Sequence, residues 1–150
     1  MKKMKKLFFF LFVSVIIASC GTKTDRLEFS KFEIKDENGK TGIAVSETGT
    51  IKINGEDIGK INRDGTLNDK EGKLLAKITE DNILQDKGGQ NLTKIDKRGT
   101  MDNGSGTYIK WTDNGELLKG TEKTGMIISP VDKKSFQSAS IILFLYLNFK

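Results

Sequence analysis

The chain has 150 residues, with 25 lysines and arginines against 20 aspartates and glutamates, and a mean hydropathy of −0.39. It contains one cysteine and no histidine. The lack of histidine excludes Ser-His and Cys-His nucleophile systems, histidine general bases and the most common zinc ligand. A single cysteine also excludes an internal disulfide framework and a multi-cysteine metal site.

The beginning of the chain has the pattern of an export signal. Residues 1–6 carry four lysines and no acid, and residues 7–17 contain a single polar side chain, that of Ser14. A positively charged start followed by about 7–15 apolar residues is typical of a secretory signal. The apolar run is shorter than the roughly 20 residues that a transmembrane helix needs.

The next residues resemble the lipobox of bacterial lipoproteins, which is an aliphatic residue, two small residues and a cysteine, here Ile17-Ala18-Ser19-Cys20. The resemblance implies that a peptidase cleaves between Ser19 and Cys20. It also implies that the Cys20 thiol carries a diacylglyceryl group and that the new amine receives a further acyl chain such as palmitate. Two or three acyl chains give firm membrane anchoring. The alternatives are an ordinary secretory signal with a nearby cysteine and an uncleaved membrane anchor.

Removal of this signal changes the charge of the protein. The four lysines are lost with it, so 21 basic residues remain against 20 acidic ones. A nucleic-acid-binding protein needs a basic surface, so no nucleic-acid partner is expected. The expected location is the bacterial cell envelope, with membrane lipid as a partner through acylated Cys20. The outer membrane is favoured over the inner one where a cell has both.

The remaining residues, about 130 in number, suffice for one small domain with one core. We expect a lipoprotein signal peptide over residues 1–19 and the lipidated cysteine with a short tether over 20–26. A β-repeat domain is expected over 27–128, and an apolar C-terminal helix packed on the sheet over 129–150.

The middle of the chain repeats with a period of 17 residues, in rows that begin at Lys60, Lys77 and Lys94. With one-residue shortenings, residues 49–51 and 115–117 extend the series to about five copies. A fixed period of this kind predicts one structural unit used repeatedly. Three apolar columns run through the rows: Ile61, Ile78 and Ile95; Leu67, Leu84 and Met101; and Ile58, Leu75, Leu92 and Ile109.

Glycine turns separate short runs of strand composition. Pairs such as Asp64-Gly65, Asn103-Gly104 and Asn114-Gly115 place glycine where a hairpin turn needs a positive φ. Turns recur about every eight residues, which leaves no room for a long helix. The predicted fold is therefore mainly β, an antiparallel meander of about five repeats curled into a partly closed roll or barrel. A β-solenoid with one coil per repeat is the alternative.

One detail of the repeat constrains the sheet. Leu75 and Ile78 are three residues apart, and a regular strand cannot place both on one face. Either a bulge intervenes or both faces are partly covered, which again favours a curved sheet.

Residues 27–46 are predicted to form two further strands. Leu27 and Phe29 alternate, and Phe32 and Ile34 continue on the other parity, which predicts a bulge near residues 30–31. Residues 36–39 are the expected turn, and residues 41–45 the returning strand.

The C-terminal segment contains a dense apolar block over residues 141–149. Ser129 is the expected N-cap and Pro130 the first helical residue. One helix from Pro130 to about Leu147 is predicted to pack on the sheet, with a terminal strand as the alternative. Nine residues are too few to span a membrane as a helix. The block is expected in the core, and a partner interface or membrane contact are the other options.

Candidate chemical groups are few. Carboxylates would have to carry any hydrolysis, but the acid clusters lie beside turn glycines, which favours solvated turn residues. Calcium at residues 62–65 and 68–72 is the alternative, although no EF-hand loop or β-roll nonapeptide is present. Trp111 and Tyr108 could stack on a sugar or peptide, but Trp111 shares the parity of Ile109, which favours core packing. The acid clusters are Asp36-Glu37, Glu56-Asp57, Asp69 with Glu71, and Glu80-Asp81.

These patterns predict a membrane-anchored cell-envelope lipoprotein that acts as a non-catalytic binding or structural module. We predict no catalytic residue, no metal and no cofactor, and leave the ligand-binding residues unassigned. The alternatives are a carboxylate-dependent enzyme acting on envelope polymers, and an accessory subunit bound to an envelope protein partner.

Overall fold

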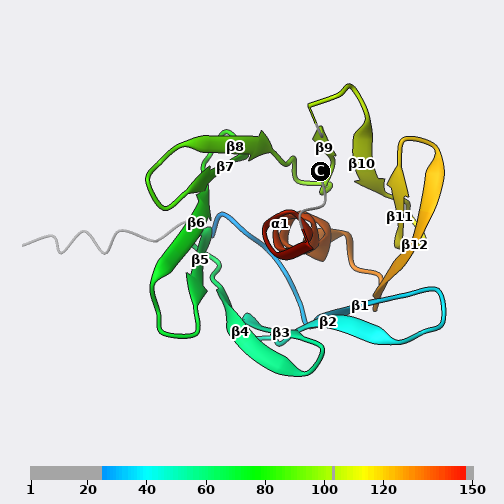
Figure 1. Ribbon diagram of the computed structural model, residues 1–150, viewed down its shortest axis with the longest axis horizontal. Coiled ribbons are helices and arrows are strands. Elements are labelled where there is room, and N and C mark those ends of the chain that lie inside the picture. The colour runs from blue at the N-terminus through cyan, green and yellow to red at the C-terminus, as the bar shows by residue number, and fades with distance from the viewer. Residues whose placement is uncertain (1–24, 103, 148–150) are drawn as a thin grey trace, which may run out of the picture.

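A computed structural model of the protein describes residues 25–102 and 104–147, which form twelve strands and one helix arranged as a ring around that helix (Figure 1). Consecutive strands form six hairpins whose tips point outward. The strands are β1 (Phe32–Lys35), β2 (Thr41–Val45), β3 (Thr50–Ile53), β4 (Glu56–Ile61), β5 (Thr66–Asp69), β6 (Leu74–Ile78), β7 (Ile83–Asp86), β8 (Asn91–Lys94), β9 (Met101–Asp102), β10 (Tyr108–Trp111), β11 (Glu116–Lys119) and β12 (Glu122–Ser129).

All neighbouring strands are antiparallel and belong to one sheet with the order β8-β7-β6-β5-β4-β3-β2-β1-β12-β11-β10-β9. The first and last strands meet, with Ile34 of β1 opposite Ile128 of β12. The two ends of the sheet, β8 and β9, are joined by a single isolated bridge between Ile95 and Met101. The sheet is therefore a meander nearly closed into a barrel. This confirms the predicted meander with a C-terminal helix, and the hairpins number six rather than about five.

Two of the predicted apolar columns form the inner wall of the ring. Side chains alternate between the two faces of a strand, and the members of these columns point inward. The first is extended by Val45, Trp111 and Ile128, and the second by Ile34, Ile51 and Leu117. All twelve side chains are buried: Val45, Ile61, Ile78, Ile95, Trp111 and Ile128; and Ile34, Ile51, Leu67, Leu84, Met101 and Leu117.

The third predicted column does not belong to the inner wall as a whole. Ile58 and Leu75 are half-buried and Leu92 is exposed. Each is the extra, unpaired residue at a shift of register between two strands, so the predicted bulge is confirmed at these positions. Ile109 is the exception and is fully buried. The interval from Ile95 to Trp111 is one residue shorter than the repeat, so Ile109 takes the inward position that Ala76 holds in β6.

The turns between hairpins, which we call the inner turns (residues 46–49, 62–65, 79–82, 96–99 and 112–115), surround the start of the helix. At Gly65 the backbone has a φ of 94°, and a Cβ would lie 2.9 Å from the carbonyl oxygen of Ile78. The Gly65 carbonyl accepts a hydrogen bond from the Ile78 N–H at 2.8 Å. The same bond joins Gly49 to Ile61 and Gly115 to Ile128. Each of these bonds closes the inner base of the hairpin that follows the turn.

The helix α1 (Phe136–Leu147) runs through the centre of the ring and is seen end-on in Figure 1. The prediction that it begins at Pro130 with Ser129 as N-cap is wrong, because Ser129 is the last residue of β12. The helical segment starts with a short 3₁₀ turn, η1 (Lys133–Ser135), which is capped by Asp132. The Asp132 carboxylate accepts from the Lys134 N–H at 3.0 Å, so an acid three residues later fulfils the capping role.

The first half of α1 carries small polar side chains that bond to the ring. The Ser140 hydroxyl donates to the Gly99 carbonyl at 2.6 Å and accepts from the indole N–H of Trp111 at 2.9 Å. The Gln137 amide donates to the Ile95 carbonyl and to the Asn82 side chain. These bonds lie beside the β8–β9 seam, so the helix supplies contacts where the strand ladder is weakest.

The predicted first strand is only partly correct. Residues 25–31, which we call the strap, do not pair in the sheet, although Leu27 and Phe29 are buried. The backbone N–H groups of Arg26 and Leu27 bond to the Arg63 carbonyl of an inner turn, and the strap then crosses to β1 beside the start of the helix (Figure 1). The irregularity predicted near residues 30–31 occurs instead in the β1–β2 pairing at Ile34 and Lys35.

Candidate functional site

The two ends of α1 mark two ends of the molecule. At the helix start lie the inner turns and the strap, because the Ser30 N–H bonds to the Ser135 hydroxyl at 3.1 Å. At the helix end, Leu147 lies beside residues of the first two hairpin tips. The predicted signal and lipobox, including Ser19 and Cys20, lie outside the described residues. The described chain enters at the helix-start end, where Arg26 pairs with Glu80 at 3.0 Å.

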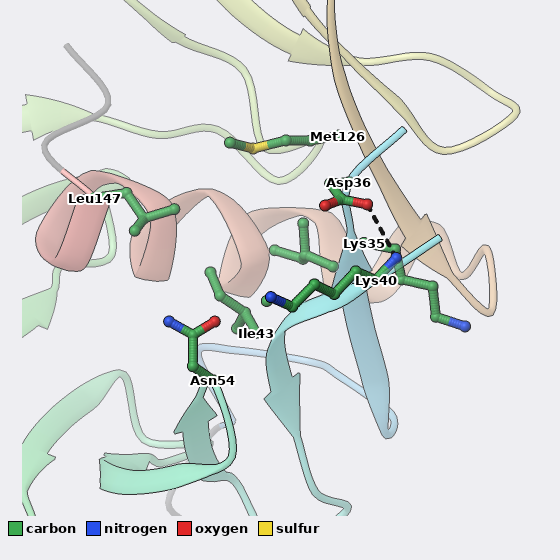
Figure 2. A pocket seen from close by; sticks show the side chains of 9 residues that line it. Lys35, Asp36, Lys40, Ile43, Asn54, Met126 and Leu147 are labelled. Atoms are coloured by element: carbon green, nitrogen blue, oxygen red, sulfur yellow. Dashed lines mark hydrogen bonds between the residues drawn. The ribbon is translucent and has the colours of Figure 1, made fainter. Parts of the chain in front are cut away.

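A cleft of about 180 Å³ opens at the helix end, between the β1–β2 hairpin and β12 (Figure 2). The outer half of β12 is not paired with β1, since their register covers only Glu33 to Lys35 opposite Ser129 to Ile127. The two hairpins diverge beyond this point, and the end of the helix fills part of the gap. The lining consists of Ile34, Lys35, Asp36, Lys40, Gly42, Ile43, Asn54, Met126 and Leu147.

The floor of the cleft is apolar. Ile34 and Ile43 are buried members of the core, and Met126 is a half-buried side chain packed against it. Leu147, the last residue of α1, is 42% exposed. The floor therefore presents apolar surface that the ring does not cover.

The rim of the cleft is polar. The Asp36 carboxylate accepts from the backbone N–H groups of Asn38 and Lys40, both at 2.9 Å, so this acid is occupied in shaping its turn (Figure 2). The Lys35 ammonium lies 3.3 Å from the Glu33 carboxylate, and this contact holds the pKa of Glu33 below its ordinary value. Lys40 makes no ion pair with any described residue. An apolar floor inside a charged rim is the composition of a contact site for an apolar side chain.

A second hollow lies at the helix-start end. It measures about 400 Å³ and is lined by Glu28, Lys97, Lys133, Lys134 and Gln137. The Lys97 ammonium donates to the backbone carbonyl of Arg26 in the strap. The Lys133 ammonium lies 2.8 Å from the Asp113 carboxylate and lowers the pKa of that acid. We call this feature the lysine hollow.

The predicted acid clusters are mainly part of the turn architecture. Asp69 accepts from the N–H groups of Glu71 and Lys73 at 3.0 and 2.8 Å, in the same arrangement as Asp36. Asp86 and Asp96 accept from backbone N–H groups in the same way. Such carboxylates hold a turn by replacing a backbone acceptor. Among the described residues, no group of three Asp, Glu, Cys or His side chains is placed to hold a metal ion.

The other predicted site residues are separated from these two sites. Asn62 and Asn68, considered for calcium, bond to each other at 2.9 Å, and Asn68 also donates to the Gly72 carbonyl. Trp111 is buried and stacks on Phe136 with ring centroids 5.7 Å apart, which confirms the prediction of core packing. Tyr108 is 54% exposed on the opposite parity. Neither pair faces the cleft.

The apolar C-terminal block divides into a buried part and an exposed end. Ile141, Ile142 and Leu143 are fully buried inside the ring, which confirms the core role predicted for this part. Residues 144–146 are half-buried and Leu147 is exposed, while the last part of the predicted block, including Phe149, lies outside the described residues. In the described part of the chain, no helix has the length and apolarity needed to cross a membrane.

Sequence reasoning did not single out the cleft. Of its lining residues, Asp36 belongs to a predicted acid cluster and Leu147 to the predicted apolar block, and Glu37, the partner of Asp36 in its cluster, lines a neighbouring hollow with Lys123. The cleft joins β1, β2 and β12 with the end of α1, and no local motif connects these segments. No protein-family model matches the chain, and neither a curated protein nor a solved structure was found to match it.

Proposed function

We propose that the protein is a lipid-anchored module of the bacterial cell envelope, held by acylated Cys20, that binds an envelope protein through the cleft at the helix end. The lipobox resemblance of residues 17–20 supports the anchor. The position of the strap supports an arrangement in which the anchor and the cleft lie at opposite ends of the ring. The chain enters the ring at the helix start, and the cleft opens at the other end of a 12-residue helix, which is about 18 Å long.

The size of the cleft favours a protein partner over a small-molecule ligand. Its volume is about 180 Å³, whereas pockets for drug-sized ligands usually measure about 300–1,000 Å³. Protein interfaces are commonly centred on one bulky apolar side chain that fills a small pocket surrounded by polar groups. The apolar floor formed by Ile34, Ile43 and Met126, with Lys40 and Asn54 on the rim, has this composition. This single observation carries the binding part of the proposal.

The anchor is tested by replacing the cysteine. In wild type, we expect the mature protein to float with membranes and its N-terminal peptide to begin at Cys20 with the added mass of the acyl groups. In the Cys20→Ser variant, we expect processing to be lost and no acyl mass on the N-terminal peptide. A variant with unchanged processing and unchanged membrane partition would exclude the lipobox.

The binding site is tested with a photo-crosslinking amino acid at Lys40 in the full, acylated chain in native membranes. Lys73 provides the matched control position, because its N–H closes the Asp69 turn as that of Lys40 closes the Asp36 turn. It does not line the cleft. We expect a discrete protein adduct from position 40 that is absent from position 73 and is lost in the Leu147→Glu variant. Equal adducts at both positions, or none at either, would count against the cleft.

A further inference from the structure

We infer that the helix-start end of the ring lies flat against the membrane, and that Lys97, Lys133 and Lys134 contact the phosphate groups of anionic lipids there. This inference rests on the proposed anchor at Cys20. It adds an interaction surface that is separate from the cleft and defines which way the cleft faces.

The length of the tether restricts the end that can reach the bilayer. Four residues lie between Cys20 and Asp25, the first described residue, so the five residue steps span at most about 17 Å when fully extended. Arg26 is already fixed to the inner turn at Arg63 by a 2.7 Å backbone bond. The cleft end lies at the far end of α1, about 18 Å further along the ring axis. The tether therefore keeps the helix-start end close to the headgroups.

The lysine hollow is the basic feature on this end. Three of its lining side chains are lysines and one is an acid, Glu28, so the lining carries two more positive than negative charges. All three ammonium groups belong to exposed side chains. Among the described residues, Lys97 and Lys134 have no carboxylate partner within ion-pair distance. Lysines in this position attract the negative surface of a membrane that contains anionic lipids.

Three of the other acids at this end are already engaged within the protein, whereas Asp25 and Asp81 are exposed there. Glu80 pairs with Arg26 at 3.0 Å, and Glu47 pairs with Arg63 at 3.6 Å. Asp132 accepts from the Lys134 N–H and from the Ser30 hydroxyl. The electrostatic potential at a charged membrane surface decays over about 8–10 Å in physiological salt. The tether limits the separation from the headgroups to about 17 Å, so the lysine hollow repeatedly comes within the screening distance, which an unanchored domain diffusing freely would do far less often.

Footprinting of the full, acylated protein tests the inference. The protein is placed in vesicles of phosphatidylcholine alone or of phosphatidylcholine mixed with phosphatidylglycerol, and its lysines are labelled with a membrane-impermeant amine reagent. We expect labelling of Lys97, Lys133 and Lys134 to be several-fold slower in the anionic vesicles. Lys40, Lys87 and Lys119, which lie on hairpin tips, provide the reference and should label at the same rate in both vesicles.

Equal labelling rates at the three hollow lysines in both vesicles, or slower labelling at the hairpin tips, would overturn the inference. Failure of the proposed anchor gives a different result, because the protein would then not float with either vesicle and its N-terminal peptide would lack acyl mass. A matched pair of variants adds a second test. Lys97→Gln with Lys134→Gln should abolish the slower labelling of Lys133, whereas Lys87→Gln with Lys119→Gln should preserve it. Unchanged protection of Lys133 in the first variant would also overturn the inference.

Discussion

The two halves of α1 are held inside the ring by different interactions. In the first half, the buried side chains of Gln137 and Ser140 form hydrogen bonds to the backbone and side chains of the ring. In the second half, residues 141–147 pack through apolar side chains, and the exposure of these side chains increases toward Leu147. Hydrogen bonds fix the position and rotation of the helix, while apolar contacts provide non-directional burial. The first half of α1, whose position is fixed by hydrogen bonds, therefore lies at the inner turns. The second half, which is held by non-directional apolar contacts, lies at the cleft.

The largest expected effect contrasts an inner turn with a hairpin tip. At Gly99 the φ is 75° and an added Cβ would lie 2.5 Å from the Phe136 carbonyl oxygen, whereas at Gly72 the φ is 84° and nothing lies within 4 Å. Gly72→Ala pays only the left-handed backbone cost, about 1–2 kcal/mol. Gly99→Ala adds overpacking against the helix, for a total of about 2–5 kcal/mol. Urea unfolding of both variants measures the difference, and equal losses would show that the helix does not press on this turn.

A second contrast separates two buried serines on the helix. Ser140 links Trp111 to Gly99, so Ser140→Ala leaves a buried indole N–H and a carbonyl without this partner and should cost about 1–3 kcal/mol. The Ser138 hydroxyl is buried and has no hydrogen-bond partner among the described residues. Ser138→Ala should therefore be neutral or stabilising, within about 1 kcal/mol. Thermal unfolding checks the order, and a larger loss at Ser138 would contradict the assignment of the polar contacts.

The hairpins and turns could be predicted from sequence because their signals are local. Positive-φ glycines and alternating apolar residues lie within one repeat, and both determine structure over a few residues. The central position of the helix could not be read in this way. Its apolar block has no useful periodicity, and its partners Asn82, Gly99 and Trp111 belong to three different parts of the chain. The alternation of Leu27 and Phe29 predicts a strand. In the structure this segment is the strap, which pairs with no strand and is bonded through its backbone to the Arg63 carbonyl.

The candidate sites were hidden from sequence for a related reason. The cleft depends on where β12 departs from β1 and on how far α1 extends, which are properties of the assembled ring. Lys97 and Lys134 are 37 residues apart and become neighbours only because the inner turn 96–99 and η1 meet at the same end. Charge at these positions is visible in the sequence, but its clustering is not.

The smallest expected effect concerns the apolar half of the helix at high pH. Burial raises the pKa of Tyr146 above its ordinary value of 10.0, and its hydroxyl has no hydrogen-bond partner among the described residues. The folded state favours the neutral hydroxyl more than the unfolded state does. The free energy of unfolding is therefore unaffected by this group below pH 10 and falls as the pH rises through the raised pKa. Tyr146→Phe should reduce this loss and stabilise the protein at neutral pH by about 1 kcal/mol or less.

The two tyrosines can be distinguished by absorbance. Tyrosinate formation is followed with pH in the Tyr108→Phe variant, which retains Tyr146, and in the Tyr146→Phe variant, which retains the exposed Tyr108. We expect the ionisation of Tyr146 to lie above pH 10. Ionisation of Tyr146 at or below pH 10 would show that the helix end is more solvated than its packing indicates.

The pairing of β1 with β12 also determines when the domain can be completed during synthesis. These strands lie at the two ends of the ring sequence, and the segment that fills the centre, α1, is made after both. A nascent chain that lacks β12 and α1 has an unpaired β1 edge and an unfilled interior, and neither can be satisfied by the residues already made. Folding of the ring is therefore completed only after α1 has left the ribosome.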